Sequence, residues 1–449
     1  MDLAILNGTV VVPDNGTFKA NVYVRNGKIA AVSSDVFEAK EVVNADGKYV
    51  APGIIDPHLH FGISAPFPEE AVTESRAALA GGVTTVGDFF GGPKPFSEIF
   101  PGIKKATEES SFVNIIPHFS IAAESQLAEI GKYVKEYGVT SFKVYMNGVP
   151  GIVPWVKDNF ILRVCEEIKK ATSKGILCCH TENGDIVEYM TAKMKKKKPD
   201  TATLLDWADT HPAIAETEAL YRLVTISDFM DMSVYMVHIV RKESVEMLSK
   251  MRFSGKKISA ETVSPYLCLN KNSPQGNSLK MEPPFQGQED TDALWNGIAR
   301  GVIDTIGTDN VTNNSAEKNL NAKNFWDIGP GYPAVEHHLP VCLHEGVIKR
   351  KIPIERVIAC MTKNPAKKFG VYPQKGSIMP GSDADLVVID LNMKKEVKAN
   401  ESNSRSDYCI YEGLVLEGWP VMTIKDGVIA AKDGKIVGKP GSQCMARQI

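Results

Sequence analysis

The amino-acid sequence predicts an α/β fold with a closed (β/α)8 barrel of the TIM type at its centre and β-rich segments at both ends. Two observations carry this prediction. The middle of the chain alternates short apolar runs with segments of helical period, which is typical of right-handed crossovers between parallel strands. The two ends are rich in strand and turn residues instead. A length of 449 residues also suits a barrel, because one barrel can take ~250 residues or more.

The chain before residue 51 and the chain after residue 383 are both expected to form strands. Near the start, Val10-Val11-Val12 and Asn21-Val22-Tyr23-Val24 are separated by Pro13-Asp14-Asn15-Gly16. Near the end, residues 384–390 resemble a buried strand, and residues 421–427 and 429–434 resemble a hairpin. Asn-Gly and similar steps between β-rich runs favour tight hairpin turns.

Eight apolar, β-branched runs between these ends are the predicted barrel strands. Helix-period segments separate them, and residues 69–80, for example, carry Ala71, Val72 and Ala77-Ala78-Leu79 behind an acidic start. Eight strand–helix units favour closure into a barrel. The runs lie near residues 54–55, 83–86, 113–116, 141–145, 176–179, 234–237, 257–260 and 302–306.

Composition excludes several classes of protein. The chain is 43% hydrophobic and 23% charged, which is typical of a globular protein and excludes disorder as the main state. A net charge of −3 provides no basic field for nucleic acid or an anionic membrane. No apolar run approaches the ~20 residues that span a bilayer, and the start has no signal-peptide pattern. The eight cysteines show no CxxC spacing, so we predict reduced thiols and a cytoplasmic location.

The segment Asp56-Pro57-His58-Leu59-His60 follows the first predicted barrel strand. Side chains two positions apart in extended chain point to the same side, so His58 and His60 can converge on a metal ion. Such a pair alone is a weak signal, and two unrelated histidines are the competing interpretation.

Three further candidates stand at the ends of other predicted strands. His180 ends the run at 176–179, His238 ends the run at 234–237, and Asp309 follows residues 303–307. Barrel active sites gather at the C-terminal ends of the strands. A single histidine in this position is usually a core residue. Five such side chains from four strands favour a metal site instead.

Lys143 lies inside Ser141-Phe142-Lys143-Val144-Tyr145-Met146, a run otherwise suited to burial. A buried lysine without a partner is costly. Pairing with a carboxylate is one solution. The other is reaction of the neutral amine with carbon dioxide, which gives N6-carboxylysine, an anion that could bridge two metal ions.

With these motifs in this order, the chain resembles the cyclic amidohydrolases of the dihydropyrimidinase, hydantoinase and allantoinase group over nearly its whole length. The matching segments are Pro52-Gly53-Ile54-Ile55-Asp56-Pro57-His58-Leu59-His60, Gly81-Gly82-Val83-Thr84-Thr85, Ser141-Phe142-Lys143, His180-Thr181-Glu182-Asn183-Gly184-Asp185, Glu261-Thr262, Asn364-Pro365-Ala366-Lys367, Lys375-Gly376-Ser377-Ile378 and Pro380-Gly381-Ser382-Asp383-Ala384-Asp385-Leu386-Val387.

The resemblance implies a barrel domain over residues 52–372 and a small β-sandwich domain formed by both termini, residues 1–51 and 373–449. It implies two divalent metal ions per subunit, expected to be Zn²⁺, with Mn²⁺, Fe²⁺ or Co²⁺ as alternatives. Carbon dioxide would carbamylate the lysine, and a hydroxide would bridge the ions. The first ion would be held by His58, His60, Lys143 and Asp309, and the second by Lys143, His180 and His238.

The implied reaction is hydrolysis of a C–N bond in a small cyclic amide, imide or ureide by the bridging hydroxide. Asp309 would take the proton of the hydroxide and return it to the leaving nitrogen. Asp56, Glu182 and Asn183 are placed to support the ligands from behind. The resemblance also implies self-association as a homotetramer or homodimer, and no nucleic-acid or membrane partner.

The chain departs from the family pattern where substrate binds. Hydantoinases and dihydropyrimidinases carry a tyrosine five residues after the carbamylated lysine, where Gly148 stands, and Tyr145 and Asn147 lie nearby. Glu282 stands where the family has a serine, and Asn310 where it commonly has a histidine. Tyr145, Asn147, Glu282 and Asn310 are therefore the candidate substrate contacts.

Residues 310–338 form a long polar segment after the strand that carries Asp309. We expect this segment to overhang the site and to set specificity. At its end, His337 and His338 are expected to face solvent rather than substrate.

Several substrates and two other functions stay open. Dihydropyrimidine and hydantoin rings are the first candidates, with allantoin or another nitrogen heterocycle, such as an oxidised purine, as the alternative. Some relatives are non-catalytic scaffolds that lost their metal ligands, whereas all six candidate ligands are present here. A mononuclear deaminase on the same barrel would not use Lys143.

Overall fold

The computed structural model describes residues 1–149 and 153–447, and its centre is a barrel of eight parallel strands. The strands neighbour one another in chain order, as the alternation in the sequence predicted. They are β6 (Ile54–Leu59), β7 (Val83–Phe90), β8 (Asn114–Ser120), β9 (Ser141–Tyr145), β10 (Ile176–His180), β11 (Ser233–Met236), β12 (Ile258–Val263) and β13 (Thr305–Gly307).

The first and last strands meet at their C-terminal ends. Leu59 forms a parallel bridge with Asn310. The backbone N–H of Asp309 donates to the carbonyl oxygen of His58 at 2.8 Å, and that of His60 donates to Asn310 at 2.9 Å. The barrel therefore closes at the residues that carry three of the predicted metal ligands.

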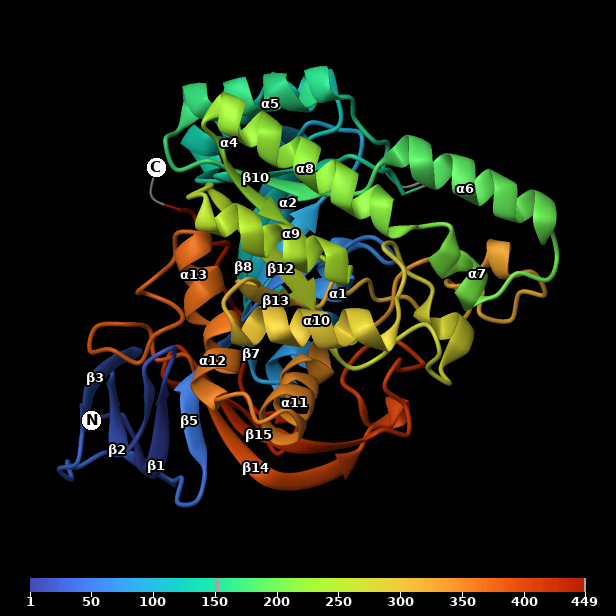
Figure 1. The fold of residues 1–449 in the computed structure, drawn as a ribbon. Helices are drawn as coiled ribbons and strands as arrows, with labels where there is room; N and C mark the ends of the chain where they lie inside the picture. Colours follow the sequence, from blue (N-terminus) through green and yellow to red (C-terminus); the bar gives the residue numbers. More distant parts are fainter. Residues whose placement is uncertain (150–152, 448–449) are drawn as a thin grey trace.

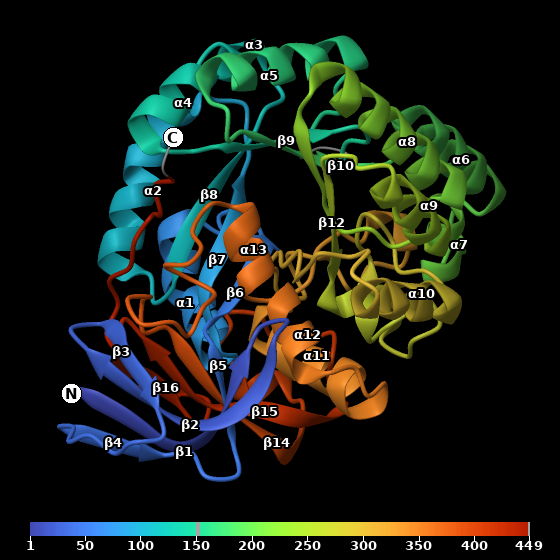
Figure 2. The ribbon, with the colours of Figure 1, turned by 60° about the vertical axis from the view of Figure 1, so that its left-hand side comes forward.

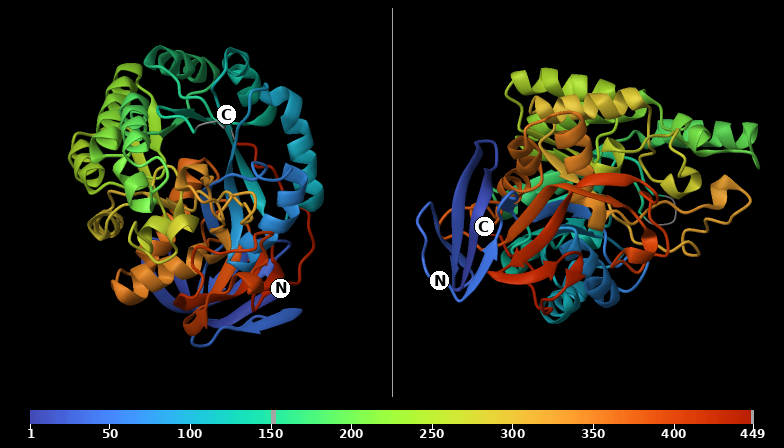
Figure 3. Two further views of the ribbon diagram at one scale, coloured as in Figure 1. Left: turned by 90° about the vertical axis from the view of Figure 1, so that its right-hand side faces the viewer. Right: turned by 90° about the horizontal axis from the view of Figure 1, so that it is seen from below.

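Helices surround the barrel and cover its strands (Figure 3, left). The longest of them, α8, carries Leu220, Leu223 and Val224 into the core, whereas α6 extends away from the barrel (Figure 1). The helices are α1 (Phe67–Ala80), α2 (Phe96–Ser110), α3 (Glu124–Leu127), α4 (Ile130–Tyr137), α5 (Asp158–Ala171), α6 (Gly184–Lys197), α7 (Leu204–Asp209), α8 (Ala213–Met230), α9 (Lys242–Phe253), α10 (Gln288–Ala299), α11 (His338–Cys342), α12 (Ile354–Cys360) and α13 (Lys363–Lys368).

Both chain ends join one mixed sheet beside the barrel (Figure 2). Its central strand β5 pairs with β1 on one side and with β14 on the other, so the two termini are fused into one unit. This arrangement agrees with the predicted terminal β domain; the boundaries at 51/52 and 372/373 stay a prediction. The strands are β1 (Leu3–Val12), β2 (Gly16–Arg25), β3 (Lys28–Ser33), β4 (Glu41–Asn44), β5 (Tyr49–Pro52), β14 (Leu386–Glu396), β15 (Val415–Lys425), β16 (Val428–Lys432) and β17 (Lys435–Ile436).

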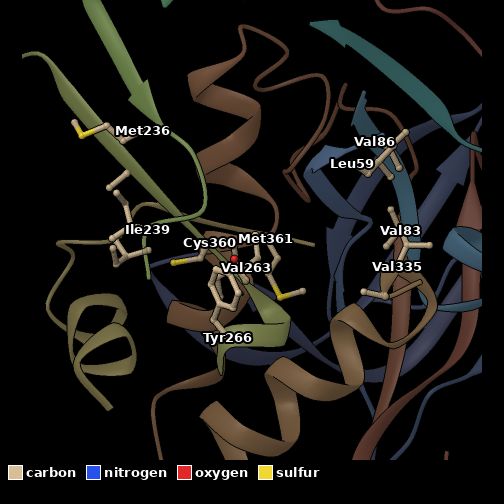
Figure 4. Packing of buried hydrophobic residues seen from close by; sticks show 14 of the residues in the cluster. Leu59, Val83, Val86, Met236, Ile239, Val263, Tyr266, Val335, Cys360 and Met361 are labelled. Carbon is tan, nitrogen blue, oxygen red and sulfur yellow. The ribbon is translucent and has the colours of Figure 1, made fainter. Parts of the chain in front are cut away.

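Two apolar clusters account for most of the core. The smaller one lies within the terminal sheet and includes Val10, Val22, Val50, Leu386 and Ile424. The larger one includes the β6 and β7 residues Leu59, Val83 and Val86 together with Val335, Met236 and Tyr266 (Figure 4). It extends into the terminal sheet through residues such as Val11, Ala51 and Val387.

The C-terminal tail returns from the terminal sheet to the floor of the barrel. The carbonyl of Gln443 accepts from Ile115 N–H at 2.9 Å, and Met445 N–H donates back to Ile115 at 2.7 Å. Arg447 is buried, and its guanidinium donates to the hydroxyl of Ser141 and to the carbonyl of Pro117, each at 2.6 Å. The tail thus closes the barrel at the end opposite to the predicted site.

Two further expectations concern membranes and disulfides. Among the described helices, none combines the length and the apolar character that crossing a bilayer requires. The eight cysteines are all free thiols, as their spacing predicted.

Candidate metal centre

The six predicted ligands gather at the C-terminal end of the barrel, and all are buried. His58 and His60 lie at the end of β6, Lys143 lies in β9, and His180 ends β10. His238 and Asp309 stand in the turns after β11 and β13. The parallel strands therefore carry side chains that are distant in the sequence to one edge of the barrel.

Two of these residues have an unusual backbone. His238 has φ of 41° and Asp309 has φ of 55°, in the left-handed region that only glycine enters freely. Such a conformation costs about 1–3 kcal/mol and is typical of functional sites. In both cases the sharp turn directly after a strand directs the side chain into the mouth of the barrel, where it lines the cavity described below.

His58, His60 and Asp309 form the tightest group. Their ligand atoms all lie within 4.8 Å of one another, and Oδ1 of Asp309 is 3.2 Å from Nε2 of each histidine. Burial raises the pKa of Asp309, but His58, His60 and Lys143 outweigh burial and hold this pKa below its usual value. An ionised carboxylate beside two imidazoles fits a divalent cation.

Lys143 lies beside this group. Its Nζ is 3.1 Å from Nε2 of His58 and stands over the rings of Phe89 and Tyr145, 4.5 and 4.8 Å from their centroids. Among the described residues, no carboxylate forms an ion pair with Lys143, so the carboxylate partner that was one alternative is not found there. The amine is enclosed next to the imidazole of His58, and Lys143 shares a cavity wall with His180 and His238.

His180 and His238 form the second group. Their ring centroids are 4.6 Å apart, and the ring of His238 stacks on that of His58 at 5.6 Å. Burial, together with His180, lowers the pKa of His238 well below its usual value. Neutral imidazole is the form that binds metal ions.

Carboxylates behind the imidazoles hold them in place. Oδ1 of Asp56 accepts the backbone N–H groups of His58 and Thr308, each at 3.1 Å, which ties β6 to β13. Oε2 of Glu182 lies 2.9 Å from Nε2 of His180, which leaves the other ring nitrogen of His180 free for a ligand role. Buried carboxylates in these positions orient metal-binding histidines.

The sequence interpretation assigned no role to Glu261 or His211. Oε1 of Glu261 lies 2.7 Å from Nδ1 of His58, and Oε2 accepts the hydroxyl of Tyr235 at 2.6 Å. Nδ1 of His211 lies 2.8 Å from the carboxylate of Glu182. An acidic residue inside the buried strand β12 was a usable signal, of the same kind as Lys143. His211 stands in a loop and offered none.

Two predicted site residues serve other purposes. Asn183 caps α6, since its Oδ1 accepts Ile186 N–H at 3.2 Å, and its amide nitrogen donates to Glu218. Asn310 accepts Ala334 N–H at 2.7 Å and donates to the hydroxyl of Thr312 at 2.8 Å. The structure does not bring either side chain to the metal-binding cavity. The amide of Asn183 is engaged at the start of α6, and the amide of Asn310 is engaged with the segment 310–338.

The expectation that His337 and His338 face solvent was wrong. Both are buried. His338 lies 2.9 Å from the hydroxyl of Ser264 through Nδ1, and His337 packs against the rings of Tyr411 and Trp419. Helix α11 begins at His338 and is buried over its whole length, so both histidines lie in the core.

An inner cavity of about 70 Å³ lies over the gathered ligands. Val311, Pro330 and Gly331 from the segment 310–338 form part of its wall, so that segment overhangs the site as predicted. Tyr145 and Glu282 line the cavity, and Asn147 lines the adjoining one. The ligands on its wall are His60, Lys143, His180, His238 and Asp309.

Gly148 has no room for a side chain. A Cβ atom there would lie 2.6 Å from the carbonyl oxygen of Val153 and 2.8 Å from the backbone nitrogen of Trp155. A tyrosine at this position would therefore require the backbone around Val153 and Trp155 to shift.

Comparisons with known proteins agree with this geometry. A model of the "Amidohydrolase family" matches residues 49–430. The L-hydantoinase of Paenarthrobacter aurescens is 28% identical over 97% of this chain and 96% of its own. The D-hydantoinase of Geobacillus stearothermophilus is 30% identical over 98% of this chain and 95% of its own. The crystal structure of the dihydropyrimidinase of Brevibacillus agri NCHU1002 covers 100% of this chain and 99% of its own, with a TM-score of 0.91 and 28% identity.

Proposed function

Because the chain belongs to the amidohydrolase family, we propose that it hydrolyses a ring C–N bond of a cyclic amide, imide or ureide with the help of divalent metal ions. One observation carries the proposal: six side chains that can bind metal ions gather from five strands at the C-terminal end of the barrel, and five of them line one cavity. Full-length relatives that are named hydantoinases support the choice of a cyclic substrate.

The donor set fits two cations. His58, His60, Asp309 and Lys143 would hold one of them, and His180, His238 and Lys143 the other, with Lys143 as N6-carboxylysine. Imidazole and carboxylate ligands suit Zn²⁺. Bound there, a pair of divalent cations would polarise the ring carbonyl and lower the pKa of a water molecule.

The protein's own residues move the proton and fix the geometry. The carboxylate of Asp309 is kept ionised by its neighbours, so it can accept a proton from the attacking water and return it to the leaving ring nitrogen. Glu261 and Glu182 hold the rings of His58 and His180 in one orientation. The overhanging segment forms part of the wall of this cavity. A homo-oligomer and a cytoplasmic location stay predictions.

A substrate panel tests the proposal. Purified protein, loaded with Zn²⁺ or Mn²⁺ in bicarbonate, would be mixed with dihydrouracil, substituted hydantoins, allantoin and cyclic imides, and ring opening would be followed by loss of ultraviolet absorbance. We expect turnover of at least one ring class. Protein that binds two ions per chain yet opens no ring would contradict catalysis, and less than one bound ion per chain would favour a scaffold.

A further inference from the structure

Glu282 stands at the junction of two cavities. The inner cavity holds the metal-binding residues, and an outer cavity of about 940 Å³ adjoins it. Val149, Val153, Glu282 and Pro330 line both. Glu282 is the one ionisable residue among the described residues that lines both. If a substrate ring lies over the metal site, a substituent on that ring would extend into the outer cavity beside the Glu282 carboxyl group.

One oxygen of the Glu282 carboxyl group is left unpaired in the described part of the chain. Its Oε2 is buried and has no hydrogen-bond partner among the described residues. The nearest cation in sequence, Lys280, donates instead to the carbonyl oxygens of Phe325 and Trp326, at 3.1 and 3.2 Å. A buried acceptor left unpaired is costly, so its presence on a cavity wall indicates a partner on the ligand.

The surroundings of Glu282 favour a neutral partner. Burial raises its pKa to about 7, with His211 and Lys280 opposing and Glu182 adding to the shift. Near neutral pH the group is thus present both as carboxylate and as neutral acid, and the acid form offers one donor and one acceptor, which matches an amide. Lys195 and Lys280 on the outer wall oppose a cationic substituent.

The shape of the outer cavity points the same way. Trp155, Trp207 and Trp326 line it. Nζ of Lys280 lies over the ring of Trp207 and Nζ of Lys195 over that of Trp326, at 5.2 and 5.4 Å from the ring centroids. Aromatic rings favour stacking with flat groups. The aromatic part of this wall and the unpaired Oε2 of Glu282 together suit a planar group that carries N–H donors.

We propose that Glu282 selects the substrate: the ring carries, on the carbon that faces the outer cavity, a neutral planar N–H donor group such as a ureido or carboxamide group. This inference rests on the proposed ring hydrolysis. A site built around a substrate N–H discriminates strongly against analogues without it, because its own polar group then stays unpaired.

The test uses metal-loaded enzyme and three hydantoins with substituents of equal heavy-atom number: ureido, isobutyl and 3-aminopropyl. We expect wild-type kcat/KM for the ureido compound to exceed that for the isobutyl compound by roughly 10²-fold or more. Glu282→Met should collapse this ratio, and Glu282→Gln, which keeps an acceptor oxygen, should retain part of it. Glu188→Gln, a change of an exposed acid on the outer wall alone, should leave the ratio unchanged.

Equal rates for the ureido and isobutyl compounds, or a ratio that survives Glu282→Met, would overturn the inference. Preference for the aminopropyl compound would contradict the claim that the substrate group beside Glu282 is neutral. Calorimetric binding of the same compounds separates this inference from the proposed function. If no ring is opened, the proposed function fails. Tighter binding of the ureido compound than of the isobutyl compound, lost in Glu282→Met, would still support the role of Glu282. Equal binding of the two compounds would refute that role.

Discussion

At the scale of single residues, the site depends on buried ionisable groups that are held by specific contacts. Lys143 forms no ion pair with an acid among the described residues and stands against imidazole and aromatic rings. Glu261 is fully buried, which raises its pKa to about 8, yet it serves His58 and Tyr235 at once. Ionisable side chains that are costly to bury alone are retained where they position metal-binding side chains.

The first prediction concerns Lys143→Ala. Loss of the bridging group should abolish ring opening and reduce bound metal, because both ions are proposed to share it. Short carboxylic acids such as propionate should restore part of the activity by filling the vacated space. Metal content by mass spectrometry and initial rates with and without propionate measure this. Lys105→Ala, on an exposed face of α2, is the control. Unchanged activity in Lys143→Ala would rule out the two-ion proposal.

The second prediction concerns Glu261→Gln. The amide offers one acceptor oxygen where the carboxyl group engages both of its oxygens, with His58 and Tyr235, so metal affinity should fall by about 10–100-fold. Competition with a chelator measures the change. Tyr235→Phe keeps the carboxylate and removes only its hydroxyl partner, so it should cost less affinity. An equal loss in both variants would assign the effect to packing instead.

At the scale of elements, the strands supply the ligands and the segment 310–338 supplies the wall. This segment is tied down by Lys318, a buried lysine whose ammonium donates to the carbonyl of Lys280 at 2.9 Å and to that of Gly331. Burial lowers the pKa of Lys318 well below its usual value. The lysine thus connects the overhanging segment to the stretch that carries Glu282.

The third prediction therefore concerns Lys318→Met, which keeps the side-chain length and removes the N–H donors. The two carbonyls lose their partner, at a cost of about 1–3 kcal/mol in unfolding free energy. Loosening of the cavity wall should raise KM, while the metal content should stay that of the wild type. Steady-state kinetics and metal analysis measure both. Lys323→Met, exposed on the same segment, is the control; loss of metal in Lys318→Met would contradict the assignment to the wall.

At the scale of the whole molecule, the barrel is closed at both ends by different parts of the chain. The site end is covered by the segment 310–338, and the floor is covered by the C-terminal tail. Phe369 and Met445 pack there against Ile55 and Ile116. Arg447 is buried beneath the barrel, and burial lowers its pKa to about 9.

The fourth prediction concerns Arg447→Ala. Buried acceptors at Pro117 and Ser141 lose their donor, so the free energy of unfolding should fall by about 1–3 kcal/mol. Urea unfolding at a fixed metal concentration measures this. KM should not change, because the floor lies at the end of the barrel opposite to the site. Arg25→Ala, at an exposed strand end, is the control, and a raised KM without loss of stability would contradict a purely structural tail.

Much of the fold and of the candidate site followed from local patterns. Strand number and order depend on the spacing of apolar runs, and parallel strands send their C-terminal ends to one edge. His58, His60, His180, His238 and Asp309 were visible for that reason. The lack of space for a side chain at Gly148 was not visible in the sequence, since its tight contacts with Val153 and Trp155 depend on how the backbone turns.

The sequence by itself determined the barrel, the terminal β unit and the positions of the candidate ligands, because each depends on residues that are neighbours in the chain. Only the tertiary structure decided what stands behind and around them. Glu261 supports His58 across a separation of 203 residues. The side chain of Asn310 forms its hydrogen bonds within the segment 310–338. His338 is buried at the start of α11. Such contacts arise from which elements pack together, and no local pattern encodes them.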